Sequence, residues 1–115
     1  MGANIGHRLR AFGVAAVKVA AALPHNAIGR HISIQWLRSS TGAGANYEEA
    51  PAADGRADFI HKVGIAAKEM REACYWIDLI RDAELVKFDV AVLADEARQL
   101  AAILGASVRT ARSRT

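Results

Sequence analysis

The stretch LRSSTGAGANYEEA, at residues 37–50, decides the fold of this chain. Its middle consists of small residues, whose short or missing side chains let another backbone approach closely: Ser39, Ser40, Gly42, Ala43 and Gly44. Glycine costs about 1 kcal/mol relative to alanine in an isolated helix, so tight tertiary contact is expected to offset that cost here. The stretch therefore predicts a helix that packs closely against a neighbouring helix.

The stretch RADFIHKVGIAAKEMREACYWIDLI, at residues 56–80, carries the second signal for the fold. Apolar residues recur in it at intervals of three and four, which is typical of one face of an α-helix. These residues are Phe59, Val63, Ala67, Met70, Cys74 and Ile77. The same spacing occurs at residues 9–23, 28–47 and 86–107, so the sequence predicts an all-α fold.

Prolines and capping residues place the helix ends. Pro24 ends the first helix because the residue before a proline is pushed out of the helical region, and Pro51 is expected to kink or end the second. The expected N-caps of the later helices are Asn26, Asp54 and Asp89. We predict one domain at residues 1–115, an antiparallel up-down-up-down four-helix bundle with helices at about residues 5–23, 26–50, 55–82 and 89–108. Beyond Val108 the apolar pattern fades, and a fraying basic tail is expected.

Composition favours an oligomer. Hydrophobic residues make up 52% of the 115-residue chain, but aromatic residues only 6%, and much of the remainder is alanine. At about 25 cal/mol per Å² of apolar surface, a small alanine-rich core stabilises a monomer only modestly. Burial against further copies of the chain is therefore expected.

Charge is distributed unevenly along the sequence. The net charge is +3, yet no acidic residue occurs before Glu48. Between residues 48 and 96 acidic residues outnumber basic ones, and the end of the chain is basic again. Such asymmetry indicates either a polyanionic partner or complementary faces between subunits.

Four sequence words within residues 35–80 carry a family resemblance: LRSS, GANYEEA, RADFIHK and EACYWIDLI. They resemble the small four-helix bundle proteins related to those encoded by intervening sequences of 23S ribosomal RNA genes. The resemblance implies a ring-like homopentamer, in a family whose members mostly have no assigned activity. A relative that works with diversity-generating retroelements is a basic pentamer thought to bind nucleic acid, which makes nucleic-acid binding a hypothesis for this chain.

The basic residues of the first half are the predicted nucleic-acid-binding set: Arg8, Arg10, Lys18, Arg30 and Arg38. In a symmetric assembly they would neutralise phosphates and release counterions. The alternatives are a solvated face, or a face that docks on the acidic side of another subunit at Glu69 and Glu72. Tyr75 and Trp76 are assigned to the core or a subunit interface rather than to base stacking. We expect a non-enzymatic, oligomeric binding protein, and the alternative is a protein-interaction scaffold that does not bind nucleic acid.

Signals for catalysis and metal binding are weak. Asp58 and His61 have the separation of one metal-ligand pair but lack partners, and residues 41–44 resemble a phosphate loop without its lysine. Ser39 and Ser40 have no histidine nearby in sequence, although a distant one can approach in the fold. No metal or cofactor is therefore expected.

The single cysteine, Cys74, cannot form an internal disulfide, and a buried free thiol in a reducing compartment is expected. No apolar run reaches the ~20 residues that span a bilayer. We therefore expect a cytoplasmic protein without a membrane segment.

Overall fold

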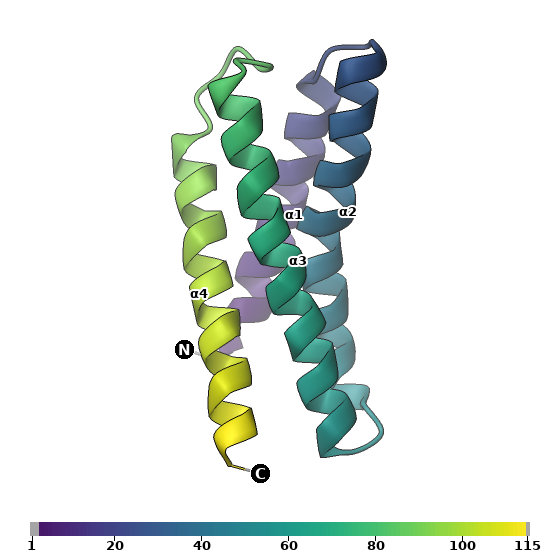
Figure 1. Ribbon diagram of the computed structural model, residues 1–115, viewed down its shortest axis with the longest axis vertical. Helices are drawn as coiled ribbons and strands as arrows, with labels where there is room; N and C mark the ends of the chain where they lie inside the picture. Colours follow the sequence, from purple (N-terminus) through teal and green to yellow (C-terminus); the bar gives the residue numbers. More distant parts are fainter. Residues whose placement is uncertain (1–2, 115) are drawn as a thin grey trace.

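Four long helices form the computed structural model, which describes residues 3–114. They are α1 (Ala3–Ala22), α2 (Ala27–Glu49), α3 (Arg56–Asp82) and α4 (Ala91–Ser113), with a short 3-10 helix η1 (Ala50–Ala52) after α2. Consecutive helices run in opposite directions and lie side by side along a molecule 46 Å long and 22 by 20 Å across (Figure 1). The predicted all-α fold is confirmed. Within the described range, no helix has the length and apolar character needed to cross a bilayer.

The turn between α1 and α2 forms as the sequence predicts. The helix α1 ends two residues before Pro24, and the Asn26 side chain caps α2 by accepting a hydrogen bond from the Gly29 backbone N–H at 2.9 Å. A Cβ atom at Gly29 would lie 1.7 Å from the Pro24 carbonyl oxygen, so the turn requires glycine there. Pro51 lies in η1, directly after the end of α2.

Two later helix starts differ from the predictions. Gly55, with φ of 99°, occupies the N-cap position of α3, so the prediction of Asp54 as the cap was wrong. The backbone N–H of Asp54 instead donates to the Asp58 carboxylate at 3.1 Å. Val90 occupies the N-cap position of α4, so the prediction of Asp89 as the cap was also wrong, although the Asp89 carboxylate accepts a hydrogen bond from the Ala91 N–H at 2.8 Å.

In the core, large side chains pack against helix surfaces that are lined by alanine. Trp36 is fully buried, its Nε1–H donates to the Ala16 carbonyl at 2.9 Å, and its ring meets the edge of Phe12 at 5.7 Å between centroids. A Cβ atom added at Gly44 would lie 3.5 Å from the Leu9 Cβ, so α1 and α2 approach closely there. The predicted packing seam is confirmed.

Two residues expected on apolar helix faces are exposed, and the expected tail is helical. Ile28, at the start of the pattern over residues 28–47, is 62% exposed while the adjacent Gly29 faces Pro24, and Phe59 is 40% exposed. Helix α4 continues beyond Val108 to Ser113 instead of fraying. Val108 is itself buried, and the Arg56 side chain donates to the Ala111 carbonyl at 3.1 Å, so the last turns of α4 pack on α3.

Candidate nucleic-acid interface

Arg8 and Arg38, two of the predicted phosphate-binding residues, are held by carboxylates of other helices. Arg8 donates from Nε and Nη2 to the two carboxylate oxygens of Glu96 on α4, at 2.9 and 2.7 Å, and this hydrogen bonding raises the pKa of Arg8. Arg38 pairs with Glu69 at 3.3 Å and with Glu72, both on α3. These pairs join α1 to α4 and α2 to α3, so both guanidinium groups are already neutralised.

The other three predicted cations lie apart from one another. Arg10 pairs with Glu48 at 3.0 Å, and both side chains are exposed. Lys18 and Arg30 are exposed and form no ion pair with any residue that the structure describes. The five predicted residues therefore do not form one continuous patch, and only two of them keep an uncompensated charge.

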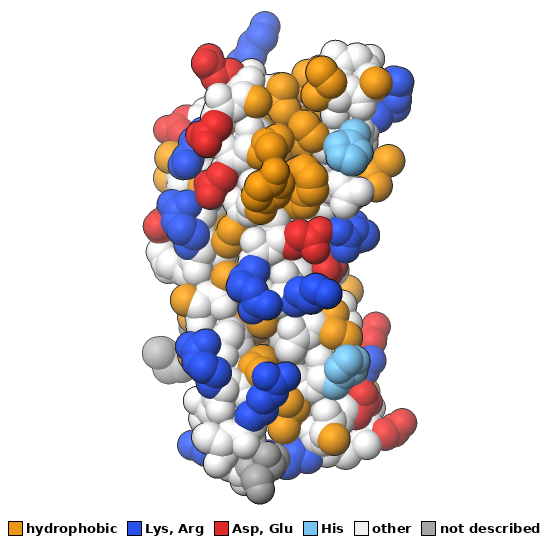
Figure 2. All heavy atoms as spheres, viewed as in Figure 1, with side chains coloured by type: hydrophobic (Ala, Val, Ile, Leu, Met, Phe, Trp, Pro, Cys, Tyr) orange, Lys and Arg blue, Asp and Glu red, His pale blue; other side chains and the backbone are white. Residues whose placement is uncertain are grey.

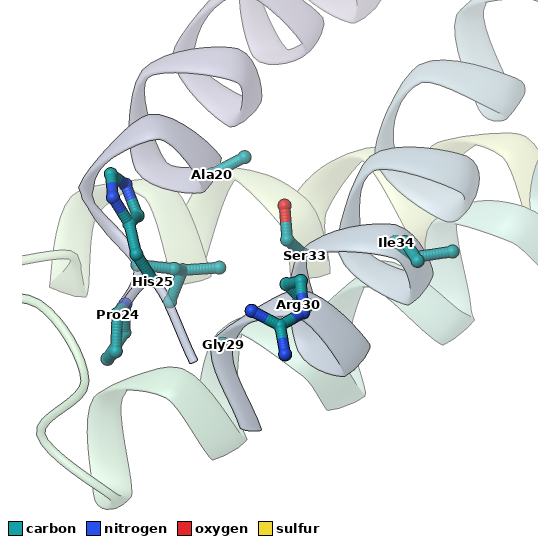
Figure 3. Close-up of a pocket in the computed structure, with 8 residues that line it drawn as sticks. Ala20, Pro24, His25, Gly29, Arg30, Ser33 and Ile34 are labelled. Atoms are coloured by element: carbon teal, nitrogen blue, oxygen red, sulfur yellow. The ribbon is translucent and has the colours of Figure 1, made fainter. Parts of the chain in front are cut away.

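Arg30 lies at an open groove beside the turn between α1 and α2. Figure 3 shows Pro24 and His25 from the turn on one side of this groove and Arg30, Ser33 and Ile34 from α2 on the other. The lining is mainly apolar, and no second cation accompanies Arg30 there. The groove by itself is a weak site for a polyanion.

The larger cationic surface lies on α3 and α4, where the sequence analysis placed no site. Figure 2 shows Lys and Arg side chains gathered over the middle and lower part of the face that α3 and α4 form, with carboxylates mostly above them and at the edges. Lys68, Arg71 and Arg109 are exposed and form no ion pair within the described chain. We call these three residues the α3–α4 cationic face.

The register of the two antiparallel helices brings Arg71 and Arg109 near each other, and Lys68 lies about one turn before Arg71 on α3. Asp78 of α3 pairs with Arg98 of α4 at 3.5 Å, and the Arg112 guanidinium lies 4.0 Å from the Cβ position of Gly64. The same register places Arg71 level with Gly105. The Arg109 guanidinium lies 3.4 Å from the Cβ position of Gly105, so it is next to Arg71 across the seam.

Among residues 3–114, no acidic side chain forms an ion pair with Lys68, Arg71 or Arg109. The whole of α4 after Glu96 lacks aspartate and glutamate. On α3, Glu69 and Glu72 turn toward α2, where they pair with Arg38, and Asp58 accepts from the chain before α3. Glu69 and Glu72 are therefore engaged on the side of α3 that faces α2, and Asp78 pairs with Arg98 farther along the seam.

A sequence signal for this face existed. Gly105, Arg109 and Arg112 follow a spacing of four and three, and Val108 and Ala111 continue the apolar side of the same helix. The prediction that residues 109–114 form a fraying tail concealed this signal. Arg109 and Arg112 lie on one side of the chain only if the segment is helical, as it is in the structure.

Nothing in the described residues assembles a catalytic or metal-binding group. The Ser40 hydroxyl donates to the Trp36 carbonyl of its own helix at 2.6 Å, and the Ser39 hydroxyl donates to backbone carbonyls in the same way. Cys74 is half-buried, and desolvation, followed by the nearby Asp78 carboxylate, raises the pKa of its thiol, which disfavours the thiolate. Over residues 3–114 no three His, Cys, Asp or Glu side chains gather closely enough to hold a metal ion.

The opposite outer face, formed by α1 and α2, is apolar. Val14, Val17 and Ile34 are 53%, 54% and 65% exposed, and the surface between the helices is hollowed beside small residues that include Gly13 and Gly44. Exposed aliphatic side chains that gather in this way are typical of a protein-contact surface. The two long sides of the bundle therefore differ in chemistry.

These features define a small all-α bundle with one cationic face and one apolar face. The chain belongs to the family of 23S rRNA-intervening sequence proteins, which it matches over residues 5–106, as the resemblance predicted. It is similar to a protein with unknown function from the S23 ribosomal protein family of Bacteroides thetaiotaomicron VPI-5482, whose crystal structure was determined at 1.70 Å. The two chains are 30% identical, with a TM-score of 0.81, and the match covers 90% of this chain and 97% of that chain. No curated protein matches this chain.

Proposed function

We propose that this protein is a non-enzymatic, homo-oligomeric nucleic-acid-binding protein. The observation that carries the proposal is the α3–α4 cationic face, where Lys68, Arg71 and Arg109 have no carboxylate partner among the residues that the structure describes. Cations that have no partner within the chain are available to phosphates, and each phosphate that they neutralise releases condensed counterions. Binding of this kind is strong at low salt and depends little on sequence.

The predicted residues Lys18 and Arg30 remain possible secondary contacts in this proposal, because neither has an ion-pair partner in the described chain. Arg8, Arg10 and Arg38 are different. A phosphate that took one of these three would leave a carboxylate without its cation, at Glu96 in the case of Arg8. We therefore assign these three arginines to holding the bundle together.

Self-association is proposed to use the apolar α1–α2 face. Val14, Val17 and Ile34 expose aliphatic surface that a second copy of the chain would bury. The homopentamer implied by the family resemblance is the proposed state, in a reducing compartment such as the cytoplasm. Repetition around a ring would present several cationic faces to one nucleic-acid strand.

The test is a fluorescence-anisotropy titration with labelled DNA and RNA at low salt. The variant K68Q/R71Q/R109Q removes the cationic face, and it should bind at least about 10-fold more weakly than the wild type. The matched control R10Q/K62Q/R81Q removes the same charge from cations that already form ion pairs with Glu48, Glu49 and Asp78. Equal loss in both variants would mean that net charge alone drives binding, and absence of wild-type binding would refute the function.

The rival function is a protein-interaction scaffold, which the exposed aliphatic residues of the α1–α2 face favour. In that case the partner would bind through apolar contacts, and affinity would depend little on salt. Replacing Val17 and Ile34 with Ser separates the two functions. Our proposal expects this variant to lose oligomer mass in light scattering, and the rival expects a stable oligomer that has lost its protein partner.

A further inference from the structure

An aromatic side chain continues the cationic stripe of α3. Lys68, Arg71 and Tyr75 lie three and four residues apart, so they share one outward side of the helix. The rise of about 1.5 Å per residue places Tyr75 about 6 Å along the axis from Arg71. Figure 2 shows hydrophobic side chains above the cationic group on this face, with carboxylates between the two on one side.

Tyr75 was assigned from the sequence to the core or to a subunit interface, and the assignment to the core is wrong because the side chain is 58% exposed. Its ring meets the half-buried Trp76 edge-on, with 5.0 Å between centroids and an angle of 81° between planes. Trp76 in turn contacts His31 of α2, at 6.1 Å between ring centroids. Tyr75 is therefore an exposed ring braced by an aromatic neighbour that packs against the core.

We propose that Tyr75 is a stacking platform for a base of single-stranded nucleic acid, whose backbone phosphates lie along Arg71, Lys68 and Arg109. This inference rests on the proposed function and specifies its ligand. An unpaired base can leave the strand and stack on an aromatic ring, whereas the bases of a duplex are stacked on one another and cannot reach it. Arg71, one turn before Tyr75 on α3, holds the phosphate of a nucleotide while the ring takes its base, and Lys68 and Arg109 hold the phosphates that follow.

The choice of a single strand over a duplex follows from the shape of the face. Lys68, Arg71 and Tyr75 follow one side of α3, with Arg109 on the adjacent α4, rather than two separated ridges that would follow both strands of a duplex. Stacking tolerates any base, so little sequence preference is expected. DNA and RNA single strands share the chemistry, and the test includes both.

The test compares Tyr75→Leu with Tyr75→Phe, using single-stranded DNA, single-stranded RNA and a duplex of the same sequence. Loss of one stacked base should weaken single-strand binding by Tyr75→Leu about 5- to 150-fold. Tyr75→Phe keeps the ring and should bind single strands within about twofold of the wild type, and duplex affinity should not change in either variant. Stronger binding of one sugar type would assign the natural strand.

Phe88→Leu is the matched control, because Phe88 is an exposed aromatic residue (49%) outside the stripe, in the connection between α3 and α4. It should bind like the wild type. Unchanged single-strand binding by Tyr75→Leu, or an equal loss for the duplex, would overturn the stacking role while leaving the proposed function intact. A fall in oligomer mass for Tyr75→Leu would also overturn it, by placing Tyr75 in a subunit contact. No binding of any probe by the wild type would overturn the proposed function itself.

Discussion

The salt dependence of binding can be worked out from the cationic face. Lys68, Arg71 and Arg109 give three phosphate contacts per subunit. For a single strand, the slope of log K against log salt is about −0.7 per neutralised phosphate, so this face contributes about −2. A rise from about 50 to 200 mM salt should then weaken the contribution of one face by about 20-fold. Each further subunit that contacts the same strand adds the same amount.

The variant K68Q/R71Q/R109Q should lose this part of the slope. Its folding should be unaffected, because all three side chains are exposed and take part in no ion pair of the described chain. The assay is an anisotropy titration at four or more salt concentrations, with circular dichroism to confirm the helix content. The control R10Q/K62Q/R81Q should keep a slope close to that of the wild type. A triple variant with the wild-type slope would refute the assignment of phosphate contacts to this face.

Three further predictions concern the bundle itself. Arg38→Glu should lower the free energy of unfolding by about 1–2 kcal/mol in urea titrations, because it sets a third carboxylate beside two others, while the unpaired Arg30→Glu should change it by less than about 0.5 kcal/mol. Gly29→Ala should lower the free energy of unfolding by about 1–3 kcal/mol, because its Cβ would collide with the Pro24 carbonyl. Gly6→Ala has open space around it and should raise the free energy of unfolding by up to about 1 kcal/mol. Equal effects of the two variants would contradict the turn geometry. The raised pKa of Cys74 predicts slower iodoacetamide alkylation of the folded than of the urea-unfolded protein near pH 8.5, and stability that declines as pH rises above the ordinary thiol range; faster alkylation of the folded protein would contradict the desolvation.

Local signals predicted the helices well because their causes are local. Pro24 ends α1 through its own ring, and Asn26 caps α2 through a contact three residues away. Most of the buried residues follow from helical periodicity, with Ile28 and Phe59 as exposed exceptions. Gly55 was missed as the N-cap because its positive φ is set by the path of the turn, which the identity of Asp54 does not reveal.

The sequence did not show which of the predicted cations form ion pairs, because ion pairing is a property of the tertiary structure. Arg8 meets Glu96, 88 residues away, and Arg38 meets Glu69, 31 residues away. Residues 1–47 contain no acidic residue, so the sequence predicts a cationic first half. In the fold, carboxylates of α3 and α4 lie beside its arginines. Arg71 is the opposite case. Acidic residues flank it in the sequence, but within the described residues none of them forms an ion pair with it.

The four lysines of the chain, Lys18, Lys62, Lys68 and Lys87, allow the most direct test, because each reports on a different surface. Acetylation of the protein with and without a single-stranded oligonucleotide, followed by mass spectrometry, measures which of them the ligand covers. We predict protection of Lys68 at the α3–α4 cationic face, with Lys87 unchanged and Lys18 affected little. Protection of Lys18 while Lys68 stays reactive would contradict this assignment. It would indicate that the ligand binds the surface formed by α1 and α2.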